Sequence, residues 1–112
     1  MTKRYCLTLG LKDDPALVKE YKYWHEQKNI WPEISKGIRE VGILDVEIHL
    51  LGNTLVMIIE MNPEFDFDQQ MAKLAKLQRQ KEWEEFVGKF QKPLPQAKPG
   101  EKWLVMERIF KL

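Results

Sequence analysis

A β-hairpin near the middle of the chain constrains the fold most strongly. Residues 44–50 alternate between apolar and polar side chains, Gly52 and Asn53 supply a tight turn, and residues 54–61 form a second run. A period of two is typical of a strand with one buried face. The second run is apolar on both faces from Leu55 to Ile59, although an antiparallel strand with one face in water should alternate with polar residues. The hairpin therefore predicts an antiparallel sheet that is covered on both faces.

Helical segments are predicted before the hairpin, after a first strand. Residues 4–9 alternate like a strand, and Asp14 followed by Pro15 is typical of a helix start. Pro32 opens a second helical stretch, and Gly42 is a plausible stop for it. The chain thus predicts a strand and two helical stretches ahead of the hairpin.

The segment after the hairpin predicts two more helical stretches and a last strand. Asp66 and Asp68 place acidic groups at the start of a helix, and apolar stripes with helical spacing occur over 66–75 and 83–90. Prolines interrupt 91–102, and 103–110 is predicted to form a closing strand. With a right-handed crossover, this order predicts an α+β fold, a ferredoxin-like βαββαβ antiparallel sheet with its helices on one face. We expect residues 1–112 to form a single domain. A second copy of the chain would cover the other face, giving a homodimer organised as a dimeric α/β barrel.

Composition excludes several classes of partner. The 112 residues are 44% apolar, which is enough for one core. Lys and Arg number 18 and Asp and Glu 17, so the net charge of +1 gives no electrostatic footprint for nucleic acid or an anionic membrane. No apolar run approaches the roughly 20 residues that cross a bilayer, and no small-residue cleavage site follows the basic N-terminus. We expect a cytoplasmic protein with no membrane or nucleic-acid partner.

Metal and cofactor motifs are missing from the sequence. Cys6 is the single cysteine, and His25 and His49 lie far apart with no spacing typical of a zinc site. The sequence contains no glycine-rich phosphate loop, no dinucleotide fingerprint and no nucleophile-elbow motif. We therefore expect neither a metal nor a cofactor.

Tyr21 and His25 are candidates for chemistry because they are four residues apart and share one face of a helix. Histidine is the natural proton carrier near neutral pH, and a tyrosine hydroxyl can orient it or bind a ligand. On spacing alone, packing with a solvated imidazole is the better explanation of the pair. The four tryptophans, Trp24, Trp31, Trp83 and Trp103, allow a similar choice, since an indole suits the C–H face of a sugar but also fills a small core.

Other polar candidates have simpler explanations. His49 lies with acidic residues on the polar side of its strand and reads as a surface or pocket-rim histidine. Glu60 and Glu107 interrupt apolar strands, where a raised pKa would suit an acid or base, but a salt bridge at a strand end is the simpler interpretation.

One stretch of sequence resembles a known family. Residues 20–25, Glu-Tyr-Lys-Tyr-Trp-His, followed by Ile-Trp-Pro-Glu at 30–33, are similar to the E-Y-x-x-x-H…I-W-P-E signature of the L-rhamnose mutarotase family. The likeness extends to Gly42, the turn at Asn53, the helical Trp83 and the closing segment 106–110. The resemblance implies a dimeric ferredoxin-like barrel and a cofactor-independent aldose 1-epimerase acting on a monosaccharide. It also implies that His25 transfers the proton and that Tyr21 and Trp83 bind the sugar.

The sequence departs from the rhamnose enzymes at several positions. Two extra residues separate His25 from the Trp-Pro pair, and the tandem Trp-Trp of those enzymes is Glu82-Trp83 here. Val46 stands where they carry a sugar-contacting tyrosine, and its side chain cannot hydrogen-bond a hydroxyl. Such a loss alters discrimination between hydroxyl epimers. The resemblance therefore implies a 6-deoxy-L-hexose, either L-rhamnose or L-fucose.

The residues suit this reaction because mutarotation moves only protons. A group with a pKa near neutrality can serve as acid to the ring oxygen and as base on reclosure, which fits His25. The partner for the O1 hydroxyl stays open among Tyr21, a pocket water, Glu82 and Glu107. Trp83, and also Trp31, would stack on the sugar. Two alternatives stay open at this point: a ligand-binding ferredoxin-like dimer without turnover, and a cofactor-free monooxygenase of the same fold.

Overall fold

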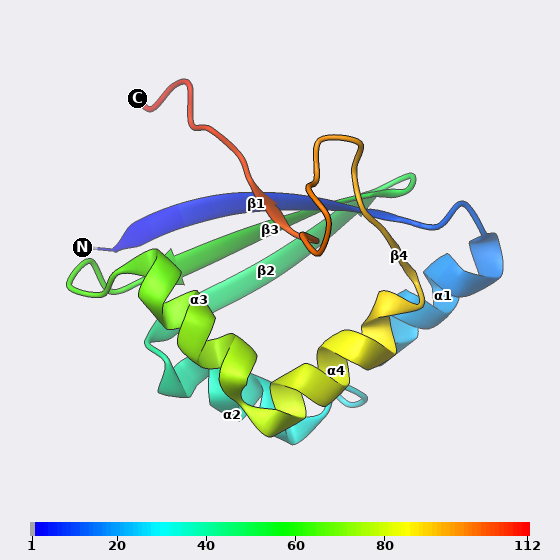
Figure 1. The fold of residues 1–112 in the computed structure, drawn as a ribbon, viewed down its shortest axis with the longest axis horizontal. Helices are drawn as coiled ribbons and strands as arrows, with labels where there is room; N and C mark the ends of the chain where they lie inside the picture. The colour runs from blue at the N-terminus through cyan, green and yellow to red at the C-terminus, as the bar shows by residue number, and fades with distance from the viewer. Residues whose placement is uncertain (1) are drawn as a thin grey trace.

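The computed structural model describes residues 2–112 and places four helices on one side of an antiparallel sheet (Figure 1). The elements follow one another as β1 (Lys3–Leu11), α1 (Pro15–Trp24), α2 (Pro32–Glu40), β2 (Ile43–Leu51), β3 (Thr54–Met61), α3 (Phe67–Lys76), α4 (Gln78–Gly88), β4 (Gln91–Lys92) and β5 (Leu104–Val105). This order confirms the predicted α+β class and the βαββαβ pattern, in which each helical segment of the pattern consists of two helices.

The sheet has the strand order β2-β3-β1-β4, and β5 pairs with β1 next to β4. Strands β1 and β3 are paired from Lys3 opposite Met61 to Gly10 opposite Thr54. Because β1 and β3 lie in the middle, the two sequence-distant halves of the chain meet there, as expected for a ferredoxin-like sheet.

Acidic residues cap two of the helices, as the sequence predicts. The Asp14 side chain accepts hydrogen bonds from the backbone N–H of Ala16 at 2.9 Å and of Leu17 at 3.4 Å, and Pro15 occupies the first turn. The Asp66 side chain accepts from the N–H of Gln69 at 2.9 Å. Each cap satisfies N–H groups that a helix start leaves without partners.

Gly42 ends the helical segment before β2, as predicted, and it is needed there for two reasons. Its φ angle of +91° lies in the left-handed region that favours glycine. A Cβ at this position would also come within 2.4 Å of the Phe65 ring. The glycine therefore allows the chain to turn into β2 while the loop before α3 packs against it.

The central hairpin is confirmed, with one irregularity. Val46, Ile48 and Leu50 share the helix-facing side of β2, but the register shifts between Ile43 and Asp45. Ile43 is therefore buried, and Leu44 is 58% exposed instead of continuing the apolar face. The alternation of residues 44–50 runs through this position without a break, so the sequence does not reveal the bulge. One extra residue there changes which side chains face each side of the sheet.

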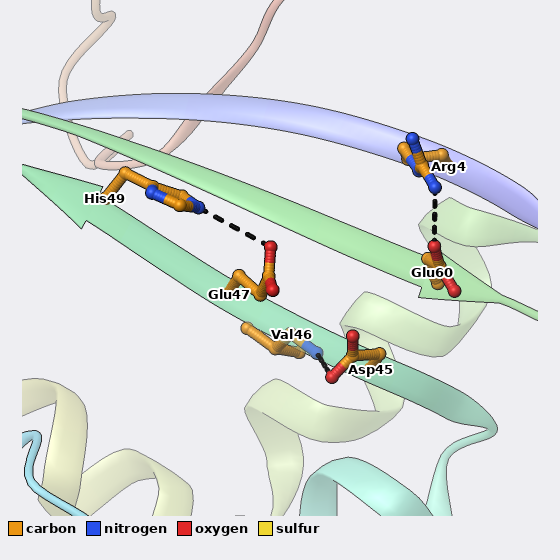
Figure 2. A network of polar contacts seen from close by, with 6 residues as sticks. All are labelled: Arg4, Asp45, Val46, Glu47, His49 and Glu60. Carbon is orange, nitrogen blue, oxygen red and sulfur yellow. Dashed lines mark hydrogen bonds and ion pairs between the residues drawn. The ribbon is translucent and has the colours of Figure 1, made fainter.

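The two faces of the sheet differ in character. The helix-facing side carries the core, including Leu7, Leu9, Leu55, Ile59 and Met61, all of which are buried. Figure 2 shows polar pairs on the sheet, Arg4 with Glu60 at 2.8 Å and His49 with Glu47 at 3.5 Å. Between these charges, the outer side of β3 carries the apolar residues Val56 and Ile58, which are only partly buried.

The closing strand is shorter than the predicted range 103–110. Leu104 and Val105 pair with Thr8 and Leu7, and the N–H of Met106 donates to the Cys6 carbonyl at 2.7 Å. Beyond this point the C-terminal segment leaves the sheet with exposed side chains (Figure 1). Within the described chain, residues 107–112 have no strand beside them, so an extended pattern alone does not produce a strand. None of the helices within residues 2–112 is both long and apolar enough to span a membrane.

Candidate active site

A cavity of about 690 Å³ lies between the helices and the sheet. Its walls are mostly apolar side chains from β1, β2, β3, α2, α3 and α4. They include Leu7, Ile34, Val46, Ile48, Met57, Ile59, Phe67, Met71, Leu74 and Val87. A few polar groups interrupt these walls, among them His25, Tyr21 and Gln91. An apolar cavity with a few converging polar groups is the usual form of a small-molecule site.

Tyr21 and His25 meet in this cavity at the end of α1. Their rings are stacked with centroids 4.1 Å apart and an interplanar angle of 29°. His25 is the C-cap of α1, so the helix ends as the imidazole reaches the cavity. The spacing of four residues therefore places both side chains at one site, as the sequence predicts.

One hydrogen bond determines which nitrogen of His25 is free. Nδ1 lies 2.7 Å from the backbone carbonyl oxygen of Tyr21. Because a carbonyl can only accept, Nδ1 carries the proton of the neutral ring, and Nε2 is left as the basic nitrogen. Burial lowers the pKa of His25 below its ordinary value of 6.5, and the bond to the Tyr21 carbonyl opposes this with a smaller effect. The neutral, basic form of His25 therefore predominates at pH 7.

Tyr21 is held in its protonated form. The residue is 3% exposed, and burial raises the pKa of its phenol above the ordinary value of 10.0. A hydrogen bond from the Gln91 side chain lowers this pKa, but by less than burial raises it. The hydroxyl is thus a neutral donor and acceptor beside the His25 ring.

Trp83 forms the third side of this group. It is 6% exposed, lines the cavity, and its ring centroid lies 5.4 Å from that of His25 in an edge-to-face arrangement. The structure thus brings three of the four predicted site residues together, from α1 and α4.

Trp31 lies behind Trp83. Its ring centroid is 5.1 Å from that of Trp83 and 5.6 Å from that of Phe86, and the Arg79 guanidinium lies 4.4 Å over its face. Trp31 is not among the described residues that line the cavity. Its link to the cavity is therefore indirect, through its contact with Trp83.

The remaining polar candidates lie elsewhere. His49 is exposed and paired with Glu47, as the surface interpretation predicts, and Glu60 forms the predicted salt bridge with Arg4. Glu107 is exposed in the C-terminal segment. Within residues 2–112, no three His, Cys, Asp or Glu residues are grouped closely enough to hold a metal ion.

Several cavity residues come from α4 and the segment after it. Trp103 is one of the four tryptophans named from the sequence, whereas Gln80, Glu84, Gln91 and Lys102 were missed. Lys102 also donates through Nζ to the Glu84 carbonyl at 3.1 Å, which ties the proline-rich loop to α4. The proline content of 91–102 indicates irregular structure but not where its side chains go, so no pattern in the sequence marks these residues.

Comparison with known proteins identifies the family of this chain. The family described as L-rhamnose mutarotase matches residues 4–112 of this chain, which is nearly its whole length. The chain belongs to the L-rhamnose mutarotase family. An L-fucose mutarotase of Xanthomonas campestris is 38% identical over 110 residues, covering 98% of this chain and 88% of that protein. A UPF0734 protein of Dictyostelium discoideum is 33% identical over 114 residues, covering 98% of this chain and 90% of its own.

Solved structures of low identity confirm the mutarotase fold. An L-rhamnose mutarotase of Formosa agariphila superimposes with a TM-score of 0.72 at 20% identity, covering 98% of both chains. Tetracenomycin F2 cyclase of Streptomyces glaucescens, a type II polyketide cyclase, superimposes with a TM-score of 0.63 at 15% identity, again over 98% of both chains. The second likeness shows that this fold also serves unrelated chemistry.

Family membership makes this chain a mutarotase, an isomerase that interconverts the anomers of a sugar. Neither alternative from the sequence, a binding dimer without turnover or a cofactor-free monooxygenase, is favoured by these matches. Val46, which departs from the rhamnose enzymes, is part of the cavity wall.

Proposed function

We propose that this mutarotase interconverts the α and β anomers of a 6-deoxy-L-hexose, L-fucose in preference to L-rhamnose, with His25 as general acid and base. The observation that carries the proposal is the Nδ1 bond of His25 to the Tyr21 carbonyl at 2.7 Å. This bond leaves the partly buried ring with one basic nitrogen, Nε2, for the cavity that His25 lines. The L-fucose mutarotase relative at 38% identity supports the choice of sugar.

The reaction needs two proton transfers, one at each of the two oxygen atoms bonded to C1. The O1 hydroxyl loses its proton as the C1–O1 bond becomes a carbonyl, the C1–O5 bond breaks, and O5 takes up a proton. After C1 rotates, the reverse steps close the ring on the other face. No electrons leave the sugar, so the reaction is complete with an acid and a base.

His25 can supply both movements from Nε2. The neutral ring accepts the O1 proton, and the resulting imidazolium donates it to O5, which is bonded to the same carbon as O1. Closure reverses the order. A positioned acid/base of this kind accelerates proton transfer by about 10² to 10⁴-fold. The neutral form favoured at pH 7 is the form that starts ring opening.

The rest of the cavity suits a deoxy sugar. The buried Trp83 offers a flat aromatic surface beside His25, which fits the C–H face of a pyranose. The apolar walls fit the C6 methyl group of a 6-deoxy sugar and would leave a C6 hydroxyl without a partner. We propose that Trp31 contributes by packing behind Trp83 rather than by contacting the sugar.

A sugar panel tests the choice of substrate. Exchange between anomers is measured by saturation-transfer NMR for L-fucose, L-rhamnose and D-glucose, each with and without EDTA. We expect L-fucose to give the largest catalysed rate, L-rhamnose a smaller one and D-glucose the smallest, with no effect of EDTA. Catalysis of D-glucose alone, or loss of all catalysis in EDTA, would refute the proposal.

Replacing Tyr21 with phenylalanine is expected to lower kcat/KM for L-fucose by several-fold. The ring that stacks on His25 remains, and one hydroxyl hydrogen bond is lost, worth on the order of 1 kcal/mol. Steady-state exchange rates at several sugar concentrations measure the change. Tyr23→Phe is the matched control, because Tyr23 is 44% exposed. An unchanged kcat/KM in Tyr21→Phe would show that the hydroxyl makes no contact that matters.

The exchange rate should rise with pH and level off near neutrality. Burial lowers the pKa of His25, so the midpoint of this rise is expected below 6.5. Because burial raises the pKa of Tyr21 above 10.0, no loss of activity is expected up to pH 10 from that group. Glu84 and Lys102 are the charged residues that also line the cavity. A rate that is flat from pH 4 to 8 would contradict proton transfer by His25.

We propose that the protein is a homodimer. Val56 and Ile58 form a partly buried apolar strip on the outer face of the sheet. The C-terminal segment adds exposed apolar side chains at Ile109 (88%), Phe110 (75%) and Leu112. Exposed apolar side chains in this number favour association with a second chain. Analytical ultracentrifugation at micromolar concentration should give a dimer mass, and a stable monomer would refute the proposal.

We also infer that the single domain works in the cytoplasm without a nucleic-acid or membrane partner. The net charge of +1 and the single free thiol of Cys6 support this inference. Cell fractionation with a tagged chain tests it.

A further inference from the structure

Gln91 is a buried amide beside the proposed catalytic pair. The residue is 6% exposed and lines the cavity. It lies in β4 opposite Leu11 of β1, so both side chains are on the helix-facing side of the sheet. Tyr21 lines the same cavity, and the Gln91 side chain is close enough to lower the pKa of its phenol.

The nitrogen and the oxygen of the Gln91 carboxamide differ in their surroundings. The Gln91 side chain lowers the pKa of the Tyr21 phenol, which is the effect of an amide N–H directed at the tyrosine oxygen. The carboxamide oxygen, Oε1, is fully buried and has no hydrogen-bond partner among residues 2–112. Buried polar atoms are normally paired, and leaving one unpaired is costly. Because Gln91 lines the cavity, a turn of its side chain would bring Oε1 within reach of a donor that enters there.

A sugar hydroxyl is such a donor. We propose that Gln91 is a substrate-binding and specificity-determining residue whose Oε1 accepts a hydrogen bond from a ring hydroxyl of the sugar. The inference rests on the proposed function, because it takes the cavity ligand to be a 6-deoxy-L-hexose. It assigns a second role to the same amide, since the N–H holds the Tyr21 hydroxyl.

Together, Oε1 of Gln91 and the Tyr21 hydroxyl offer the sugar one hydrogen-bond acceptor and one donor. Because the Tyr21 oxygen accepts from Gln91, its own proton is free to point toward the sugar. Oε1 of Gln91 and the Tyr21 hydroxyl then read neighbouring polar groups of the ligand. L-fucose and L-rhamnose differ in configuration at C2 and C4, so a fixed acceptor favours the sugar whose hydroxyl reaches it.

Gln91→Met is the test variant, because it keeps the length of the side chain and removes both polar ends. We expect kcat/KM for L-fucose to fall by about ten-fold or more, the loss of one or two hydrogen bonds. The matched control is Gln70→Met. Gln70 is also 6% exposed, but its amide donates to the Val41 carbonyl and it does not line the cavity. Its substitution should lower thermal stability and leave KM unchanged.

Deoxy sugars identify the contact directly. The 2-, 3- and 4-deoxy analogues of L-fucose are compared in wild type and Gln91→Met. We expect one analogue to lose about ten-fold in kcat/KM with the wild type and to lose much less with the variant. If Gln91→Met does not fold, Gln91→Asn, which draws the same amide back by one methylene, should give the same pattern.

A double variant separates direct contact from action through Tyr21. Gln91→Met in the Tyr21→Phe background should lower kcat/KM further, because Oε1 still has its own contact to lose. No further loss in that background would show that Gln91 only positions Tyr21 and would overturn the inference. Equal losses for every analogue in wild type and variant would also overturn it. If the wild type does not catalyse exchange of L-fucose or L-rhamnose at all, both the proposed function and this inference fail.

Discussion

Replacing His25 with alanine or asparagine is expected to slow anomer exchange by about 10²-fold or more, the loss that follows removal of one general acid/base. His25→Asn is the sharper variant. An asparagine amide can occupy the position of Nδ1 and donate to the Tyr21 carbonyl, but it has nothing equivalent to the basic Nε2. The local hydrogen bond is kept and the proton carrier is lost.

The fold should survive both substitutions at His25. The imidazole contributes one hydrogen bond and a stacking contact with Tyr21, together worth about 1–3 kcal/mol. A domain of this size has roughly 5–15 kcal/mol of stability to lose. His49→Ala is the control, because His49 is an exposed histidine paired with Glu47 and lies outside the cavity. A folded His25→Asn protein that exchanges anomers at the wild-type rate would show that another residue is the acid/base.

Trp83→Ala is expected to lower the free energy of unfolding by about 3–5 kcal/mol, the usual cost of removing a buried tryptophan. Trp83 is 6% exposed and its ring contacts those of His25, Trp31 and Phe86. Its loss would open a cavity between α1, α2 and α4. Urea unfolding followed by circular dichroism measures the change.

Trp24→Ala is the matched control for Trp83. Trp24 contacts Phe86 and Tyr23 but is only partly buried and does not line the cavity, so a smaller loss is expected. Trp83→Phe should keep an aromatic surface, fold normally and raise KM for L-fucose. If Trp83→Ala unfolded at the same urea concentration as wild type, the aromatic cluster would not be part of the stabilising core.

The sequence predicts most of the fold because its signals are local. Capping by Asp14 and Asp66, the stop at Gly42 and the hairpin turn at Gly52 and Asn53 each depend on a few neighbouring residues, and all are present in the structure. The bulge at Ile43 to Asp45 and the short β5 were missed. Both depend on which strand lies alongside, and a sequence pattern does not contain that information.

The candidate site also has features that the sequence predicts and features that it does not. Tyr21 and His25 are found from their spacing on one helix, and Trp83 joins them by the family resemblance. The tautomer of His25 depends on a backbone carbonyl, and the position of Gln91 depends on pairing between β4 and β1. Neither follows from a motif, because each arises only when distant segments pack together.

The central claim is that this chain exchanges the anomers of a deoxy sugar without changing their equilibrium. Saturation-transfer NMR on L-fucose at equilibrium tests it most directly, with the α-anomeric proton saturated and the β-anomeric signal followed. The account predicts transfer that grows in proportion to protein concentration, an unchanged ratio of α to β anomers, and no growth with His25→Asn. Transfer no faster than in buffer for L-fucose and for L-rhamnose would contradict it.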